Sequence, residues 1–143
     1  MTGTVELSAA QVALVRASYA EVKRLDQNYS SLFYHRLLEQ HPFTRALFPD
    51  DLARQISVFR LTIDALIEQL DEPGAWQAGL SELGRRHVNY GVLPKHYGYV
   101  GSVLIDTLAE MLGERFDAAT RIAWETLYDR VTQAMLSPKF EDG

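Results

Sequence analysis

One histidine lies where a predicted helix turns its apolar side inward. His87 follows Trp76, Leu80 and Leu83 at spacings of three and four residues, so the four side chains share one helix face. A single histidine on such a face is more often a core residue with satisfied hydrogen bonds than a ligand. Imidazole is also the side chain that can bind iron at one axial position without adding charge. His87 is therefore the first candidate for a cofactor site.

Two further polar side chains lie among apolar ones. Tyr34 and Gln55 interrupt the apolar stripes of two other predicted helices, and Phe48 lies in a short segment between two prolines. In an all-α chain, one inward histidine with a separate inward hydroxyl and amide indicates a cofactor site with one protein ligand. The motifs of phosphate-binding loops, zinc hydrolases, serine hydrolases and EF-hands are absent from the sequence.

The elements that position these residues are predicted to be helices. Prolines divide the chain, and helical periodicity fills the blocks between them. No stretch alternates with period two, so we expect no strand. Ser8 and Gln11 fit a capping box at the first helix. The expected helices cover residues 8–25, 29–41, 43–48, 52–70, 75–90, 94–113 and 118–137. These are about seven helices in a single domain over residues 1–143, with loose tails at 1–7 and 138–143.

Composition limits the classes of function. The 143 residues are 47% hydrophobic and 23% charged, which is typical of a globular protein. The net charge of −5 disfavours general binding to nucleic acid or to an anionic membrane. We find no signal peptide and no apolar run long enough to span a bilayer, so we expect a cytoplasmic protein without membrane insertion. The chain has no cysteine, which excludes disulfides, thiolate metal sites and thioether-linked cofactors.

The sequence resembles the globins, specifically bacterial single-domain globins and the haem domain of flavohaemoglobins. The most specific stretch covers residues 83–92 and continues into His96-Tyr97 and Val100-Gly101. Further matches lie at Leu32-Phe33-Tyr34, His41-Pro42, Leu47-Phe48-Pro49, Ala123-Trp124 and Tyr128. The resemblance extends over about residues 8–137, and it implies a globin fold of about seven helices around a haem pocket.

Four site residues follow by position from this resemblance. It makes His87 the proximal histidine that ligates the haem iron, and it makes Phe48 the phenylalanine that stacks on the porphyrin. Tyr34 and Gln55 match the distal pair that hydrogen-bonds bound dioxygen. His35, His41 and His96 are expected at the surface or at corners, so a second histidine ligand is not expected.

The remaining pocket residues also follow from the resemblance. Phe59 falls where a bulky apolar residue roofs the distal pocket. The backbone carbonyl of Leu83 is the expected acceptor for the second ring N–H of the proximal histidine. Val92 and Val100 are expected to contact the macrocycle. Tyr97 matches a tyrosine on the proximal side.

The proximal side contains one departure from the flavohaemoglobin pattern. In that family a glutamate joins the tyrosine and the histidine in a hydrogen-bonded network. Its place falls at about Lys139, after Pro138, and Glu141 lies in the tail. Without that carboxylate we do not expect peroxidase-like chemistry.

The resemblance implies a cofactor and an activity. The cofactor is noncovalent haem b, and the ligands are dioxygen, nitric oxide and other diatomic gases. In the resembled family, the stabilised oxygen complex converts nitric oxide to nitrate, after which the iron must be reduced again. Residues 8–137 leave no room for a flavin domain, so an external reductase is expected. Two alternatives stay open, namely oxygen storage, delivery or sensing without catalysis, and a globin-shaped domain without haem. The protein is expected to be a monomer or a homodimer.

Overall fold

The computed structural model describes residues 7–26 and 28–136, and every regular element in these ranges is a helix. The six α-helices are α1 (Ala9–Leu25), α2 (Tyr29–Gln40), α3 (Leu52–Glu68), α4 (Pro73–Asn89), α5 (Pro94–Leu112) and α6 (Ala118–Leu136). Three short 3₁₀-helices connect them, namely η1 (Pro42–Leu47), η2 (Gln69–Asp71) and η3 (Gly113–Arg115). The prediction of an all-α fold is confirmed. Apart from Leu7, the predicted tails at 1–7 and 138–143 lie outside the described residues.

Local sequence signals determine several helix ends. Ser8 and Gln11 form the predicted capping box: the Gln11 backbone N–H donates to Ser8 Oγ (3.0 Å), and the Ser8 N–H donates to Gln11 Oε1 (3.1 Å). Gly91, just after α4, has φ of +86°, which glycine adopts without steric cost. α4 begins slightly earlier than predicted, at Pro73, because a proline in the first turn of a helix gives up no hydrogen bond.

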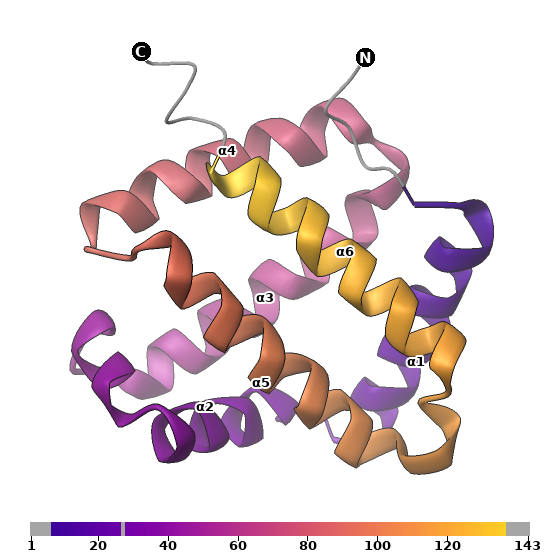
Figure 1. Cartoon of the computed structure of the whole chain (residues 1–143), viewed down its shortest axis with the longest axis horizontal. Helices are drawn as coiled ribbons and strands as arrows, with labels where there is room; N and C mark the ends of the chain where they lie inside the picture. The colour runs from indigo at the N-terminus through magenta and orange to yellow at the C-terminus, as the bar shows by residue number, and fades with distance from the viewer. Residues whose placement is uncertain (1–6, 27, 137–143) are drawn as a thin grey trace.

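α5 and α6 run side by side across the front of the view in Figure 1, and α1, α2 and α4 each pack on one or both of them. α6 also contacts α1 and α4, α5 also contacts α1 and α2, and α3 packs on α2. The core between them includes Val15, Phe33, Leu108 and Trp124. In the described part of the chain, no helix has the length and hydrophobicity that a membrane span requires.

The side chain of Trp76 joins α3 and α4 at one end. Trp76 is 2% exposed, and its indole N–H donates to the carbonyl oxygen of Leu66 (3.1 Å). From this joint the two helices diverge toward the side where α5 begins (Figure 1). Gln55 lies eleven residues before Leu66, and His87 lies eleven residues after Trp76. At 1.5 Å per residue, each candidate residue is roughly 16 Å along its helix from the joint.

Gly84 provides a test of the packing of α4 on α6. A Cβ at Gly84 would overlap the backbone carbonyl of Met135, whereas a Cβ at Gly79, in the same helix, would meet no atom within 4 Å. We expect Gly84→Ala to lower the free energy of unfolding by about 1–3 kcal/mol through overpacking. Gly79→Ala should raise it by roughly 0.5–1 kcal/mol. Urea unfolding followed by circular dichroism measures the free energy of unfolding of both variants. An equal increase in this free energy in the two variants would contradict the close approach of α4 and α6.

Candidate functional site

Tyr34 of α2 and Gln55 of α3 are in direct contact. The Gln55 side-chain Nε2 donates a hydrogen bond to the Tyr34 hydroxyl oxygen at 3.2 Å. Tyr34 is 2% exposed, and burial raises its pKa to about 12, although the Gln55 hydrogen bond opposes that rise. The phenol is therefore neutral at pH 7. Among the described residues no group accepts the Tyr34 hydroxyl proton, so this proton is available to a bound molecule.

An aromatic cluster surrounds the Tyr34 ring. Phe33, Phe48 and Phe59 contact it edge to face, with ring centroids 5.0, 5.2 and 5.5 Å away. Phe33 and Phe59 stack on each other with centroids 4.6 Å apart. These rings hold Tyr34 in one orientation and exclude water from its neighbourhood. Phe59 thus lies beside the distal pair, as its predicted role requires.

Arg45 anchors the loop that carries Phe48. Its guanidinium donates to the backbone carbonyl oxygens of Phe48 (3.3 Å), Pro49 (3.2 Å) and Asp50 (3.4 Å). No role was predicted for Arg45. The sequence does contain a feature that could have indicated this role, namely a cation three residues before Phe48 in a segment between two prolines. In such a segment, helical hydrogen bonds cannot satisfy every backbone carbonyl.

His87 is half-buried near the end of α4. Its Nδ1 lies 2.9 Å from the carbonyl oxygen of Leu83, which is the contact that the family resemblance implied. Burial lowers the pKa of His87, the nearby Arg86 charge lowers it further, and the Leu83 hydrogen bond opposes both. At neutral pH the ring is therefore uncharged and donates through Nδ1. Its Nε2 makes no hydrogen bond within the described ranges, and it has the lone pair that a metal ion requires.

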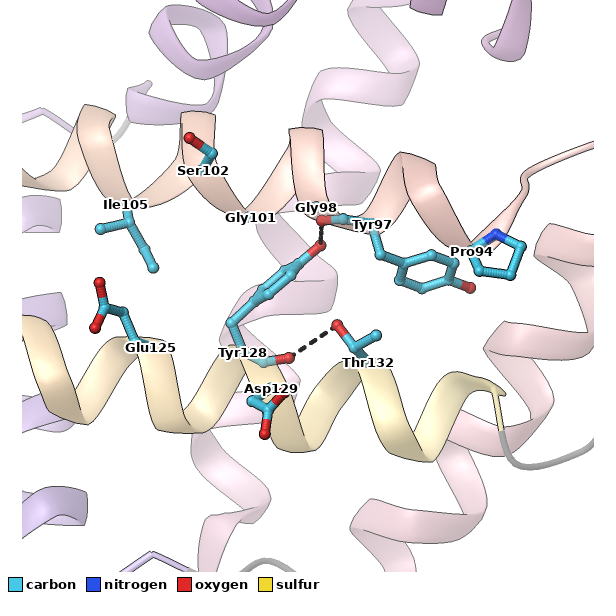
Figure 2. Close-up of a pocket in the computed structure, with 10 residues that line it drawn as sticks. All are labelled: Pro94, Tyr97, Gly98, Gly101, Ser102, Ile105, Glu125, Tyr128, Asp129 and Thr132. Carbon is cyan, nitrogen blue, oxygen red and sulfur yellow. Dashed lines mark hydrogen bonds between the residues drawn. The ribbon is translucent and has the colours of Figure 1, made fainter.

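Tyr97 and Tyr128 connect α5 and α6 beside this histidine. The ring centroids of Tyr97 and His87 are 6.3 Å apart. The Tyr128 hydroxyl donates to the Tyr97 carbonyl oxygen at 2.6 Å, and its ring packs where a Cβ at Gly101 would overlap it (Figure 2). Thr132 Oγ1 in turn donates to the Tyr128 carbonyl oxygen at 3.0 Å. These contacts hold Tyr97 in place, whereas the departure predicted at Lys139 lies outside the described residues.

The other three histidines occupy the surface and corner positions expected of them. His96 is buried in the first turn of α5, where its Nδ1 accepts the Leu93 backbone N–H at 2.9 Å. His41 follows the last residue of α2, and its ring lies 4.6 Å from that of Tyr99. His35 is exposed. In the part of the chain that the structure describes, no three His, Cys, Asp or Glu residues group into a metal site.

The surroundings of His87 fit an apolar cofactor with one axial ligand. The Val92 backbone N–H donates to the His87 carbonyl oxygen (3.1 Å), and Val92 and Val100 pack against the core while staying partly exposed. A flat apolar group between the diverging α3 and α4 would cover such surface and meet the free Nε2. The residues present therefore fit haem.

The titration of Tyr34 tests the distal geometry. Because the folded-state pKa is about 12 and the ordinary value is 10.0, the neutral phenol stabilises the fold. This contribution is fully present below pH 10 and is lost as the pH rises through 12. In ¹³Cζ-tyrosine NMR spectra, we expect the resonance that Tyr34→Phe removes to stay unshifted up to pH 11. Gln55→Leu should raise the pKa further, because it removes the donor that stabilises the phenolate. A titration midpoint of Tyr34 near pH 10 would contradict the burial of this ring.

Comparison with known proteins places the chain in a family. The globin family model matches residues 31–135. A leghemoglobin of Canavalia lineata is 30% identical over 139 residues, covering 90% of this chain and 93% of the relative. An anaerobic nitrite reductase of Arabidopsis thaliana is 29% identical over 148 residues, covering 93% of this chain and 94% of the relative. An engineered carbene transferase, made from a candidate nitric oxide dioxygenase of Rhodothermus marinus, has a similar structure (TM-score 0.82, 29% identity, 95% of both chains). The chain belongs to the globin family.

Proposed function

We propose that the chain holds noncovalent haem b, with Nε2 of His87 as its only protein ligand to iron. The observation that carries this proposal is a neutral imidazole whose Nδ1 is engaged by Leu83 and whose Nε2 is free. Globins are haem proteins, and the chain has no cysteine that could form a thioether to the cofactor. Phe48 and Phe59 on the distal side, with Val92 and Val100 on the other, would contact the macrocycle.

When bound, the haem supplies the iron site for dioxygen and for the conversion of nitric oxide to nitrate. The chain supplies two hydrogen-bond donors. Gln55 has a second amide N–H beside the one given to Tyr34, and the Tyr34 hydroxyl proton is free. A hydrogen bond to a charged acceptor is worth about 1.5–3 kcal/mol, and the aromatic cluster keeps water from competing for it. The pair should therefore hold dioxygen tightly and release it slowly.

Slow release suits a reactant better than a carrier, so we propose nitric oxide dioxygenation with an external reductase. The similar Rhodothermus structure and the Arabidopsis nitrite reductase support nitrogen-oxide chemistry, and the leghemoglobin relatives support dioxygen as ligand. Oxygen storage or delivery uses the same residues and predicts fast release. The rate of oxygen dissociation separates the two functions.

Haem binding is the first test. Titration of the purified haem-free chain with hemin should produce a Soret band that saturates at one haem per chain. His87→Gly should weaken binding, and added imidazole should restore the spectrum because it replaces the lost axial nitrogen. A chain without a Soret band would contradict the proposal and favour a globin-shaped domain without haem.

Tyr34→Phe tests the role of the distal hydroxyl. Loss of one hydrogen bond of about 1.5–3 kcal/mol should speed oxygen dissociation about tenfold to a hundredfold, because each 1.4 kcal/mol is a factor of ten. Stopped-flow displacement of oxygen by carbon monoxide measures the rate. Tyr90→Phe, at a position 66% exposed, is the matched control and should leave the rate unchanged. Equal rates in wild type and Tyr34→Phe would show that the distal assignment is wrong.

Rapid mixing of the oxygenated protein with nitric oxide tests the reaction itself. We expect fast conversion to the ferric protein with one nitrate formed per haem. Slow oxidation without nitrate would leave oxygen storage or delivery as the function.

A further inference from the structure

The corner between α4 and α5 lies at one edge of the fold and carries positive charge (Figure 1). Between Glu82 and Asp106 the sequence has no other carboxylate side chain but has three cations, namely Arg85, Arg86 and Lys95. All three are exposed. Arg85 pairs with Glu82 at 3.4 Å, whereas Arg86 and Lys95 form no ion pair within residues 7–26 and 28–136. The corner therefore attracts an acidic surface, although the chain has a net charge of −5.

Exposed apolar side chains accompany these cations. Val88, Tyr90 and Leu93 are 48%, 66% and 50% exposed, and Phe43 of η1 is 53% exposed. The rings of Phe43 and His96 have centroids 6.2 Å apart, and His96 Nδ1 accepts the Leu93 backbone N–H, so Phe43 adjoins the corner. Single exposed apolar side chains are ordinary, but a cluster of them indicates an interaction site. We call the following residues the corner surface: Phe43, Arg86, Val88, Tyr90, Leu93 and Lys95.

The corner surface is built on the residue proposed to bind iron. The backbone N–H groups of Tyr90 and Val92 both donate to the His87 carbonyl oxygen at 3.1 Å. Arg86 directly precedes His87 in α4. Electron tunnelling between proteins slows steeply with distance, so an electron donor must bind close to the haem that it reduces. A donor protein on the corner surface would meet this requirement.

Charge argues against a second copy of the chain as the occupant. Two corner surfaces placed face to face would bring Arg86 and Lys95 of one copy against the same cations of the other. The carboxylates of Glu125 and Asp129, which line the groove beyond Pro94 in Figure 2, are each paired with an arginine of α6. They therefore do little to neutralise the corner. A partner with negative charge fits this surface better.

We propose that the corner surface docks the external reductase, and that this reductase is a one-electron donor protein whose binding face is acidic around an apolar centre. The inference rests on the proposed function, because it gives the docking surface and the charge of the partner which that function requires. One electron passes from the donor to the ferric iron, so the donor is oxidised and the iron becomes ferrous. Tyr90 and Leu93 supply apolar contact, while Arg86 and Lys95 attract and orient the partner.

Charge reversal at Lys95 tests the attraction. A reduced plant-type ferredoxin is the probe, because it is an acidic protein that donates one electron at low potential. Stopped-flow mixing with the ferric haem protein without oxygen measures the bimolecular rate constant of reduction. Lys95→Glu should lower this constant about fivefold or more at low ionic strength, and added salt should lower the wild-type constant. The variant should fold, because an acidic residue in the first turn of α5 is favourable.

Two more variants complete the comparison. Leu93→Ser should also lower the ferredoxin rate, because it removes apolar contact while serine remains a good N-cap for α5. Arg121→Glu is the matched control for charge and should react at the wild-type rate. Arg121 pairs with Asp106, which lies eleven residues along α5 from Lys95, or roughly 16 Å. Photoreduced riboflavin, which is uncharged and needs no docking, should reduce all the variants equally fast.

Binding is measured separately from electron transfer. In ¹H–¹⁵N NMR spectra of the carbon monoxide complex, added oxidised ferredoxin should shift or broaden the amide signals of residues 88–95 and leave those of residues 118–122 unchanged. Equal ferredoxin rates in wild type, Lys95→Glu and Leu93→Ser would overturn the docking proposal. A dimer in analytical ultracentrifugation that Leu93→Ser dissociates would also overturn it, because a second copy would then cover the corner. Absence of nitrate in the nitric oxide test would contradict the proposed function, whatever the ferredoxin rates are.

Discussion

The hydrogen bond from the Trp76 indole to the Leu66 carbonyl fixes where α3 and α4 meet, and the candidate site depends on it. Trp76 is almost completely buried, so its N–H must be satisfied inside the protein, and the Leu66 carbonyl satisfies it. Because the helices are joined at this one end, their other ends can diverge. Gln55 and His87 lie equally far from the joint, on opposite helices, and can therefore face a cofactor from its two sides.

Bonds from side chains to backbone carbonyls position the residues around that cofactor. Arg45 holds the Phe48 loop, Tyr128 holds the start of α5 at Tyr97, and the Leu83 carbonyl orients His87. Each of these bonds fixes a group before any ligand arrives, so binding does not have to supply the cost of ordering it. Within residues 7–26 and 28–136, the Tyr34 hydroxyl proton and the Nε2 atom of His87 thus make no hydrogen bond.

The sequence predicted the elements well because helical periodicity, prolines and caps are local signals. The capping box at Ser8 and the left-handed Gly91 follow from residue types alone. Family resemblance led us to expect Tyr34 and Gln55 at one site, but it did not predict the hydrogen bond between them. Apolar periodicity indicated only that each side chain points inward. Arg45 and the Trp76 joint were not predicted, because their partners are backbone carbonyls whose position depends on how loops and helices pack. The roles of His87 and the distal pair remain predictions.

Resonance Raman spectroscopy of the ferrous, ligand-free haem protein tests whether His87 is the axial ligand of the iron. We expect a five-coordinate haem with an iron–histidine stretching band that shifts when histidine is labelled with ¹⁵N. The band should disappear in His87→Gly and return when imidazole is added. A band that persists in His87→Gly without added imidazole, or a six-coordinate ferrous haem in the wild type, would contradict the assignment of His87 as the one axial ligand.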